Sequence, residues 1–161
     1  MKKSVLLNQL KEAVSREEYE KLMTDTISDI SQYNRRTMLE IMDSTEAPEG
    51  EVSSDQIAAL KNTLKAYLGT YMADHPESWK WIILPCIYLC FVCLLPLHPQ
   101  EAVHYTTKQE EDTTLYFCPM REDVPGSVCH FCVCRKQACL LGDWLYASSV
   151  IISAQLEFIL V

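Results

Sequence analysis

Four cysteines in one short stretch of the chain have a spacing typical of a metal site. Cys129 and Cys132 form a Cys-x-x-Cys pair, Cys118 precedes this pair, and Cys134 follows it. A tight turn between two cysteines directs both thiolates toward one point, and zinc binds four nitrogen or sulfur ligands tetrahedrally. The stretch therefore predicts a metal knuckle, a turn-rich segment that holds one metal ion.

Three ligands are expected to be Cys118, Cys129 and Cys132. The fourth position has three candidates: Cys134, His98 and His130. Cys134 would give an all-sulfur site, although it lies only two residues after Cys132. His98, directly before Pro99, would complete a site of three cysteines and one histidine. Zinc is favoured because a nearby histidine could close its shell, and a closed zinc site is normally structural. An iron–sulfur cluster is the alternative, because the cysteine spacing of such clusters varies widely.

A second group of cysteines lies in an apolar segment. Cys86, Cys90 and Cys93 are spaced at i, i+4 and i+7, which places them on one face of a continuous helix. Free cysteine behaves as a small buried hydrophobic residue, and the neighbours here are isoleucine, leucine, valine and phenylalanine. We expect these thiols to be structural; participation of one of them in the metal site is the alternative.

Composition excludes some classes of function. The chain has 161 residues, of which 48% are hydrophobic and 22% are charged, as in a globular domain. The net charge of −8 disfavours general binding to a phosphate backbone. The apolar run at the N-terminus stops at Asn8, which is too early for a secretory signal. We therefore expect a cytoplasmic protein in a reducing environment, where cysteines more often bind metal than form disulfides.

Hydrophobic periodicity predicts a mainly α protein. A short helix spans about residues 6–14, and the capping box of Ser15 and Glu18 opens a second helix that continues to Ile41. An acidic linker over residues 43–52 follows. A third helix, capped by Ser53, should end at His75, before a proline. Its buried face is expected to contain a regular stripe of large residues: Ile57, Leu60, Leu64, Tyr67, Leu68 and Tyr71.

A fourth helix is expected to start at Pro76 and to kink or restart near Leu84, because Pro85 follows. The sixteen residues from Ile82 to Leu97 carry no charge. A membrane span needs about 20 such residues. A central helix, buried on all sides, is therefore the favoured interpretation, and a membrane-associated segment is the alternative.

After residue 98 the pattern changes to residues that favour strands. Two such runs, residues 103–107 and 113–117, flank a polar segment at residues 108–112 and predict a hairpin whose second strand leads to Cys118. We interpret the chain as a helical bundle over residues 1–97 and a small β-hairpin and metal-knuckle subdomain over residues 98–137. An apolar C-terminal tail over residues 138–161 is expected to pack on the bundle.

The same segment resembles an uncharacterised protein family of methanogenic archaea. The residues that carry the resemblance are Leu97-His98-Pro99, Tyr116-Phe117-Cys118-Pro119 and Cys129-His130-Phe131-Cys132. The resemblance is specific over about residues 96–137 and loose before them. It implies a helical N-terminal part, a function that is not known, and a pattern that includes Cys118, Cys129, Cys132 and His98. Cys134 and Cys139 are not part of that pattern, and residues 138–161 extend beyond it.

No catalytic motif is present. The chain lacks a glycine-rich phosphate loop, a nucleophile elbow and a zinc-protease motif. The sequence therefore favours a cytoplasmic zinc protein that interacts with another protein and has no catalytic role. An iron–sulfur redox or enzymatic component is the alternative. The sequence indicates neither a substrate nor an oligomeric state.

Overall fold

The structure is a computed structural model that describes residues 1–27 and 30–137. Helices make up most of it, and a small sheet lies toward its C-terminal side, as predicted. The helices are α1 (Lys3–Glu12), α2 (Arg16–Met23), α3 (Gln32–Asp43), α4 (Ser54–Tyr71), η1 (Pro76–Trp79), α5 (Lys80–Ile87), η2 (Tyr88–Cys93), α6 (Gln100–Val103) and η3 (Val128–His130). The strands are β1 (Thr106–Glu110), β2 (Thr113–Cys118) and β3 (Arg135–Lys136).

Serine caps start three of the α-helices, and two of these caps were predicted. Ser15 Oγ accepts a hydrogen bond from the backbone N–H of Glu18 at 3.3 Å, and the Glu18 carboxylate accepts one from the Ser15 N–H at 2.9 Å. This reciprocal pair is the predicted capping box of α2. Ser53 caps α4 by accepting from the N–H of Gln56 at 3.4 Å. Both predicted helix starts are confirmed.

The prediction of one helix from Ser15 to Ile41 is wrong. Helix α2 ends at Met23, and Asp25 adopts a left-handed conformation with φ of 54° that a continuing helix does not allow. Ser31 then caps a new helix, α3, by accepting from the N–H of Asn34 at 3.1 Å. The short polar side chains between Met23 and Ser31 favour turns and caps over helix, so local chemistry interrupts an otherwise helical stripe.

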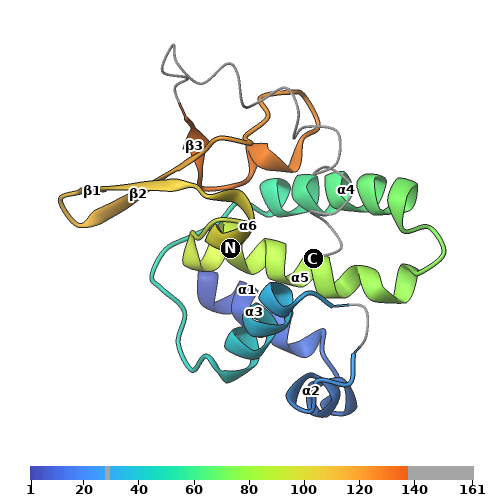
Figure 1. Ribbon diagram of the computed structural model, residues 1–161. Coiled ribbons are helices and arrows are strands. Elements are labelled where there is room, and N and C mark those ends of the chain that lie inside the picture. The colour runs from blue at the N-terminus through green and yellow to red at the C-terminus, as the bar shows by residue number, and fades with distance from the viewer. Residues whose placement is uncertain (28–29, 138–161) are drawn as a thin grey trace.

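Helix α5 forms the centre of the core, as predicted. Figure 1 shows α5 between α4 on one side and α1 and α3 on the other. Nearly all side chains from Trp81 to Val92 are buried, and they pack with the buried stripes of the surrounding helices. No helix among the described residues is long and apolar enough to cross a membrane.

Pro85 does not restart the helix. It lies inside α5, which runs directly into the π-helix η2. A π-helical turn is wider than an α-helical turn and often follows a disruption of the regular hydrogen bonds, which proline causes because it has no N–H. After Pro85 the hydrogen-bond pattern changes from α-helical to π-helical. The π-helix η2 ends at Cys93, and the next residue, Leu94, is left-handed with φ of 54°.

The structure confirms most of the predicted buried face of α4, but not the predicted C-terminal end of this helix. Ile57, Leu60, Leu64 and Leu68 are buried, whereas Tyr71 is 56% exposed. Its ring lies against that of Tyr67, with ring centroids 4.5 Å apart. The helix also ends at Tyr71, four residues before the expected end. A tyrosine at the last turn can lie beside a neighbouring ring and stay accessible to water.

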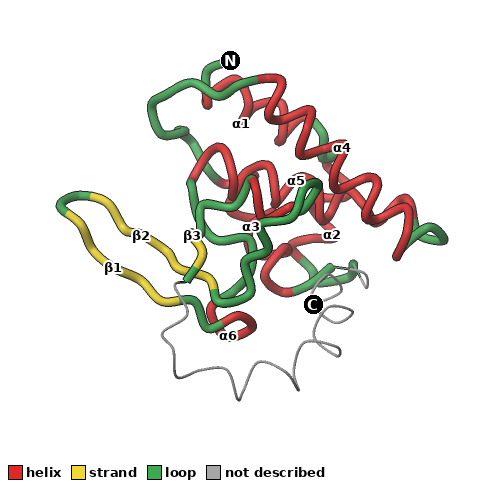
Figure 2. Tube along the Cα trace, turned by 90° about the horizontal axis from the view of Figure 1, so that it is seen from above, coloured by secondary structure: helices red, strands yellow, loops and turns green. Residues whose placement is uncertain are grey.

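The sheet consists of the predicted hairpin and one short additional strand. β1 and β2 are antiparallel, with Glu110 opposite Thr113 across a two-residue turn, and Figures 1 and 2 show this hairpin projecting away from the helices. The predicted first strand is shifted: residues 103–105 precede β1, and α6 ends at Val103. The polar residues 108–110 belong to β1, because both faces of this strand are open to water.

The predicted C-terminal tail, residues 138–161, lies outside the described residues, as does Cys139. The division into three segments that the sequence suggests stays a prediction.

Candidate functional site

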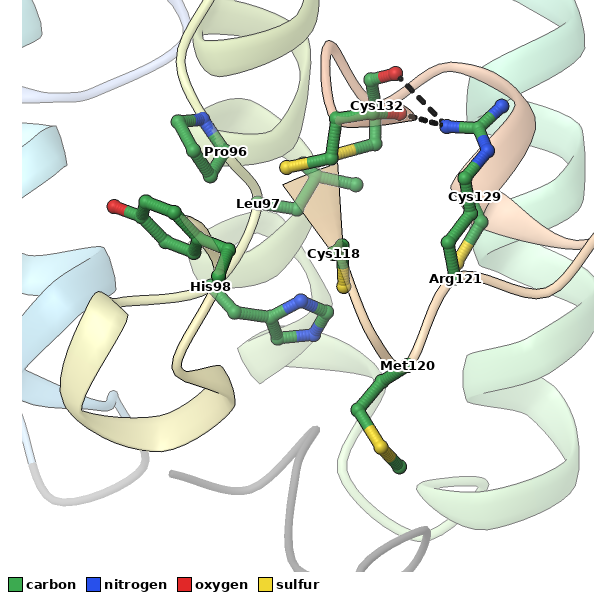
Figure 3. Close-up of a pocket in the computed structure, with 10 residues that line it drawn as sticks. Pro96, Leu97, His98, Cys118, Met120, Arg121, Cys129 and Cys132 are labelled. Carbon is green, nitrogen blue, oxygen red and sulfur yellow. Dashed lines mark hydrogen bonds between the residues drawn. The ribbon is translucent and has the colours of Figure 1, made fainter. Parts of the chain in front are cut away.

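One small pocket brings together five of the six candidate metal ligands. Figure 3 shows this pocket, where the loop after η2 meets the end of β2 and the segment from η3 to β3. Its volume is about 40 Å³. The lining residues are Pro96, Leu97, His98, Tyr105, Cys118, Met120, Arg121, Cys129, Cys132 and Cys134. A cavity of this size has room for an ion or a few water molecules, but not for an organic substrate.

Strand pairing positions Cys118. It is the last residue of β2 and is buried. Its register partner in the parallel β3 is Lys136, and its carbonyl oxygen accepts a hydrogen bond from the N–H of Gln137 at 3.3 Å. The predicted delivery of Cys118 by the second strand of the hairpin is confirmed, and β3 adds a contact that the sequence did not indicate.

A tight turn joins the two cysteines of the Cys-x-x-Cys pair, as expected. Ser127 Oγ accepts from the N–H of Cys129 at 3.2 Å and so caps η3. The N–H of Cys132 donates to the carbonyl oxygen of Cys129, also at 3.2 Å. The turn places both cysteines on the pocket wall.

The structure distinguishes among the three candidates for the fourth ligand. Cys134 and His98 line the pocket, and His130 does not. The ring of His130 is exposed, and its Nε2 lies 2.8 Å from the carbonyl oxygen of Val124. His130 is therefore not part of the site.

His98 has the chemical state of a metal ligand. Burial lowers the pKa of its imidazole, because a charged ring loses its hydration there. A neutral imidazole carries one nitrogen lone pair, and only this form of the ring can bind a metal.

Cys132 and Cys134 form a tightly coupled pair. A hydrogen bond from the Cys134 thiol lowers the pKa of Cys132, and the backbone N–H groups of Cys134 and Leu97 and the charge of Arg121 lower it further. The same thiol–thiol hydrogen bond, followed by burial, raises the pKa of Cys134. One sulfur of the pair is thus favoured as a thiolate that accepts N–H donors, and thiolates are the form that binds metals.

Cys118 has a similar backbone environment. Burial raises the pKa of its thiol, and the backbone N–H groups of Met120 and Arg121 act against this rise. N–H groups directed at sulfur stabilise a negative charge there. At Cys118 burial outweighs these N–H groups, whereas at Cys132 the hydrogen-bond donors and the charge of Arg121 outweigh burial.

The cysteines of the apolar segment are in a different environment. Cys86 and Cys90 are buried in the main core, and neither they nor Cys93 line the pocket. Burial raises the pKa of Cys86 to about 12 and that of Cys93 to about 11. Cys93 donates a hydrogen bond to the carbonyl oxygen of Tyr88 at 3.5 Å. The predicted burial of this group is confirmed for Cys86 and Cys90, and Cys93 is half-buried.

Sequence reasoning missed Arg121 as a part of the site. Its guanidinium donates to the carbonyl oxygens of Cys132 and Cys134 and pairs with the carboxylate of Asp123. In the sequence, Arg121 is one basic residue in a turn, and no local pattern distinguishes it from the exposed Arg135. Its contacts depend on the approach of a segment eleven residues further along the chain.

The side chains do not form a finished coordination shell. Within residues 1–27 and 30–137, no set of three or more histidine, cysteine, aspartate or glutamate side chains is arranged to hold a metal ion. The backbone thus gathers the candidate ligands around one pocket, while their donor atoms do not share a common centre.

Comparison with known proteins identifies a family. The chain belongs to the family described as "Uncharacterized protein conserved in archaea (DUF2115)", which it matches over residues 1–137. It is also similar to a UPF0305 protein of Methanocaldococcus jannaschii, with 24% identity over 120 residues, 73% of this chain and 70% of that protein. No solved structure matches the chain significantly. The resemblance seen in the sequence is confirmed, and it extends over the helical part as well.

Proposed function

We propose that this chain is a zinc-binding protein whose metal site is structural and supports an interaction with another protein. The observation that carries the proposal is the convergence of three separate segments on one pocket: residue 98, residue 118 and residues 129–134. Cys118, Cys129 and Cys132 are the proposed ligands, with Cys134 or His98 in the fourth position.

The environment of the donor groups supports this choice. The hydrogen bond from the Cys134 thiol, with nearby backbone N–H groups, lowers the pKa of Cys132, and backbone N–H groups act against the burial that raises the pKa of Cys118; burial lowers the pKa of the His98 imidazole and so favours its neutral form. Metal binding requires deprotonated thiols and neutral imidazole. The ligand side chains must turn toward a common point when the ion binds, and the tight turn from Cys129 to Cys132 already places two of them on the same wall.

The size of the pocket favours a structural role over a catalytic one. A volume of about 40 Å³ leaves no space for a substrate beside an ion. A zinc ion would contribute free energy to a region whose apolar cluster has, within the described part of the chain, three buried residues: Val103, Cys118 and Cys134. The adjoining loop exposes Met120 and Val124, which suits contact with a protein partner. A cytoplasmic location is part of the proposal.

Metal analysis tests the proposal. The full chain, purified without chelator, should contain about one zinc ion per molecule. Cys129→Ser should lose the ion and increase amide hydrogen exchange over residues 118–137, because an open shell no longer holds the turns together. Cys90→Ser is the matched control and should retain the ion, since Cys90 lies in the core of the helices. A wild-type protein without zinc, after zinc has been supplied during expression, would refute the proposal.

The fourth ligand can be identified by a pair of variants. Cys134→Ser and His98→Gln should differ in zinc affinity, and the larger loss marks the ligand. Cobalt substitution adds a spectroscopic measurement, because the visible spectrum of Co²⁺ reports the number of thiolate ligands. If both variants bind zinc as tightly as the wild-type protein, neither residue completes the shell.

An iron–sulfur cluster is the second candidate, because four cysteines line the pocket and four thiolates are the usual ligands of such clusters. Protein purified without oxygen should then be coloured and contain iron. A colourless protein that contains zinc and no iron would exclude this candidate.

A further inference from the structure

Arg121 lies against the cysteine pocket with a half-buried side chain. Only 17% of the side chain is exposed, and its Nη1 donates to the carbonyl oxygen of Cys132 at 3.3 Å and to that of Cys134. Its Nε lies 3.2 Å from the Asp123 carboxylate. Figure 3 shows the two hydrogen bonds to the carbonyl oxygens.

These contacts join two parts of the site that are distant in sequence. Arg121 belongs to the turn that follows β2, where its N–H donates to the carbonyl oxygen of Cys118 at 3.4 Å. The carbonyl groups that accept from its side chain belong to the segment between η3 and β3. A single side chain therefore connects the cysteine at the end of β2 to the second half of the knuckle.

Arg121 also places a positive charge beside the cysteines that line the pocket. It is the only cationic residue among the described residues that line the pocket, apart from the titratable His98. One Zn²⁺ with three thiolates has a formal charge of −1, and with four thiolates it has −2. A fixed positive charge beside such a centre offsets the excess, and arginine keeps its charge at any physiological pH.

We propose that Arg121 is a positioning residue of the metal site, which holds the two halves of the knuckle together and offsets the negative charge of the thiolate ligands. This inference rests on the proposed zinc function. Asp123 orients the guanidinium, and Lys136 pairs with the same carboxylate at 3.3 Å, so that the arginine stays available to the cysteine segment.

Three variants test the role of Arg121. Arg121→Met removes the charge and the hydrogen bonds, Arg121→Lys retains the charge without the planar fork, and Arg135→Met is the control on the exposed β3. Zinc affinity is measured by competition with a chromophoric chelator. We expect Arg121→Met to bind zinc about 10–100-fold more weakly, as is usual when an outer-shell partner is lost. Arg121→Lys should recover part of this loss, and Arg135→Met should bind as the wild-type protein does.

The outcomes separate this inference from the proposed function. If the wild-type protein binds no zinc, the proposed function fails and Arg121 has no metal site to position. If the wild-type protein binds zinc and Arg121→Met binds it equally tightly, only the inference about Arg121 is overturned. Hydrogen exchange of the metal-free proteins provides a second measurement. Arg121→Met should exchange faster over residues 129–137 than the wild-type protein. Equal exchange rates in the two proteins would contradict the inference that Arg121 holds the two halves of the knuckle together. Far-UV circular dichroism confirms that the helices remain folded.

Discussion

The helical core and the cysteine segment of residues 118–134 place the same amino acid in different environments. Cys86 and Cys90 lie on a helix whose backbone N–H groups are directed along the helix axis, and burial raises the pKa of both thiols. Burial also raises the pKa of Cys118, whereas the hydrogen bond from the Cys134 thiol, nearby backbone N–H groups and the charge of Arg121 lower the pKa of Cys132. The comparison teaches that burial raises the pKa of a thiol unless hydrogen-bond donors and a positive charge outweigh it, as they do at Cys132.

The two regions also differ in what stabilises them. The core contains most of the buried apolar side chains, whereas the second cluster has Val103, Cys118 and Cys134 with a few partly buried neighbours. We expect Ile87→Ala, at a fully buried position in α5, to lower the free energy of unfolding by about 2–5 kcal/mol, because it leaves a cavity. Urea unfolding followed by far-UV circular dichroism measures this. Val103→Ala should cost less than about 2 kcal/mol and affect mainly the sheet; an equal cost would contradict the comparison.

The second prediction exchanges one atom in a core cysteine. Cys90→Ser should lower the free energy of unfolding by about 1–3 kcal/mol, because a hydroxyl is more costly to bury than a thiol when it lacks a partner. Zinc content should not change. Cys90→Ala serves as the control for the loss of volume. A change in the metal content of Cys90→Ser would end the separation of the two cysteine groups.

The third prediction concerns alkaline pH. An unfolded thiol ionises at a pKa of about 8.5, while burial raises the pKa of Cys86 to about 12 in the folded protein. Between these values the unfolded chain binds fewer protons than the folded one, so stability is retained below pH ~8.5 and falls as the pH rises. The slope is about 1.4 kcal/mol per pH unit for each such thiol. Chemical unfolding from pH 8 to 11 should show that the free energy of unfolding declines less steeply with pH in Cys86→Ala than in the wild-type protein. Identical slopes in the two proteins would contradict a raised pKa for Cys86.

Local chemistry explains how much of this fold the sequence could predict. The caps at Ser15 and Ser53 and the uncharged run in α5 act through neighbouring residues, and so does the turn from Cys129 to Cys132. All of these were visible in the sequence. Together they predict most of the helical elements and the two cysteines of the pair.

Features that depend on distant segments were not visible. The pairing of β3 with β2 involves two residues, too few for a strand pattern, and the contacts of Arg121 exist only because those strands meet. The break between α2 and α3 is hidden for another reason: an apolar stripe continues across it, and a single capping serine, Ser31, marks the start of α3. Of the site, the sequence therefore predicts the cysteines and His98 but not the residue that joins its halves.

The smallest expected effect lies in the hairpin that links the two regions. Glu111, in the two-residue turn, has φ of 50°, a left-handed conformation that costs a residue with a Cβ atom about 1 kcal/mol. Glu111→Gly should therefore stabilise the hairpin by up to about 1 kcal/mol, offset in part by the greater entropy of glycine in the unfolded chain. Amide exchange over residues 106–117 should slow, while that of α5 stays unchanged. Glu110→Gly, within β1, is the control and should have the opposite effect, because glycine weakens a strand. Slower exchange throughout α5 in Glu111→Gly would show that the hairpin and the core unfold as one unit, and the two regions could then no longer be treated as separately stabilised.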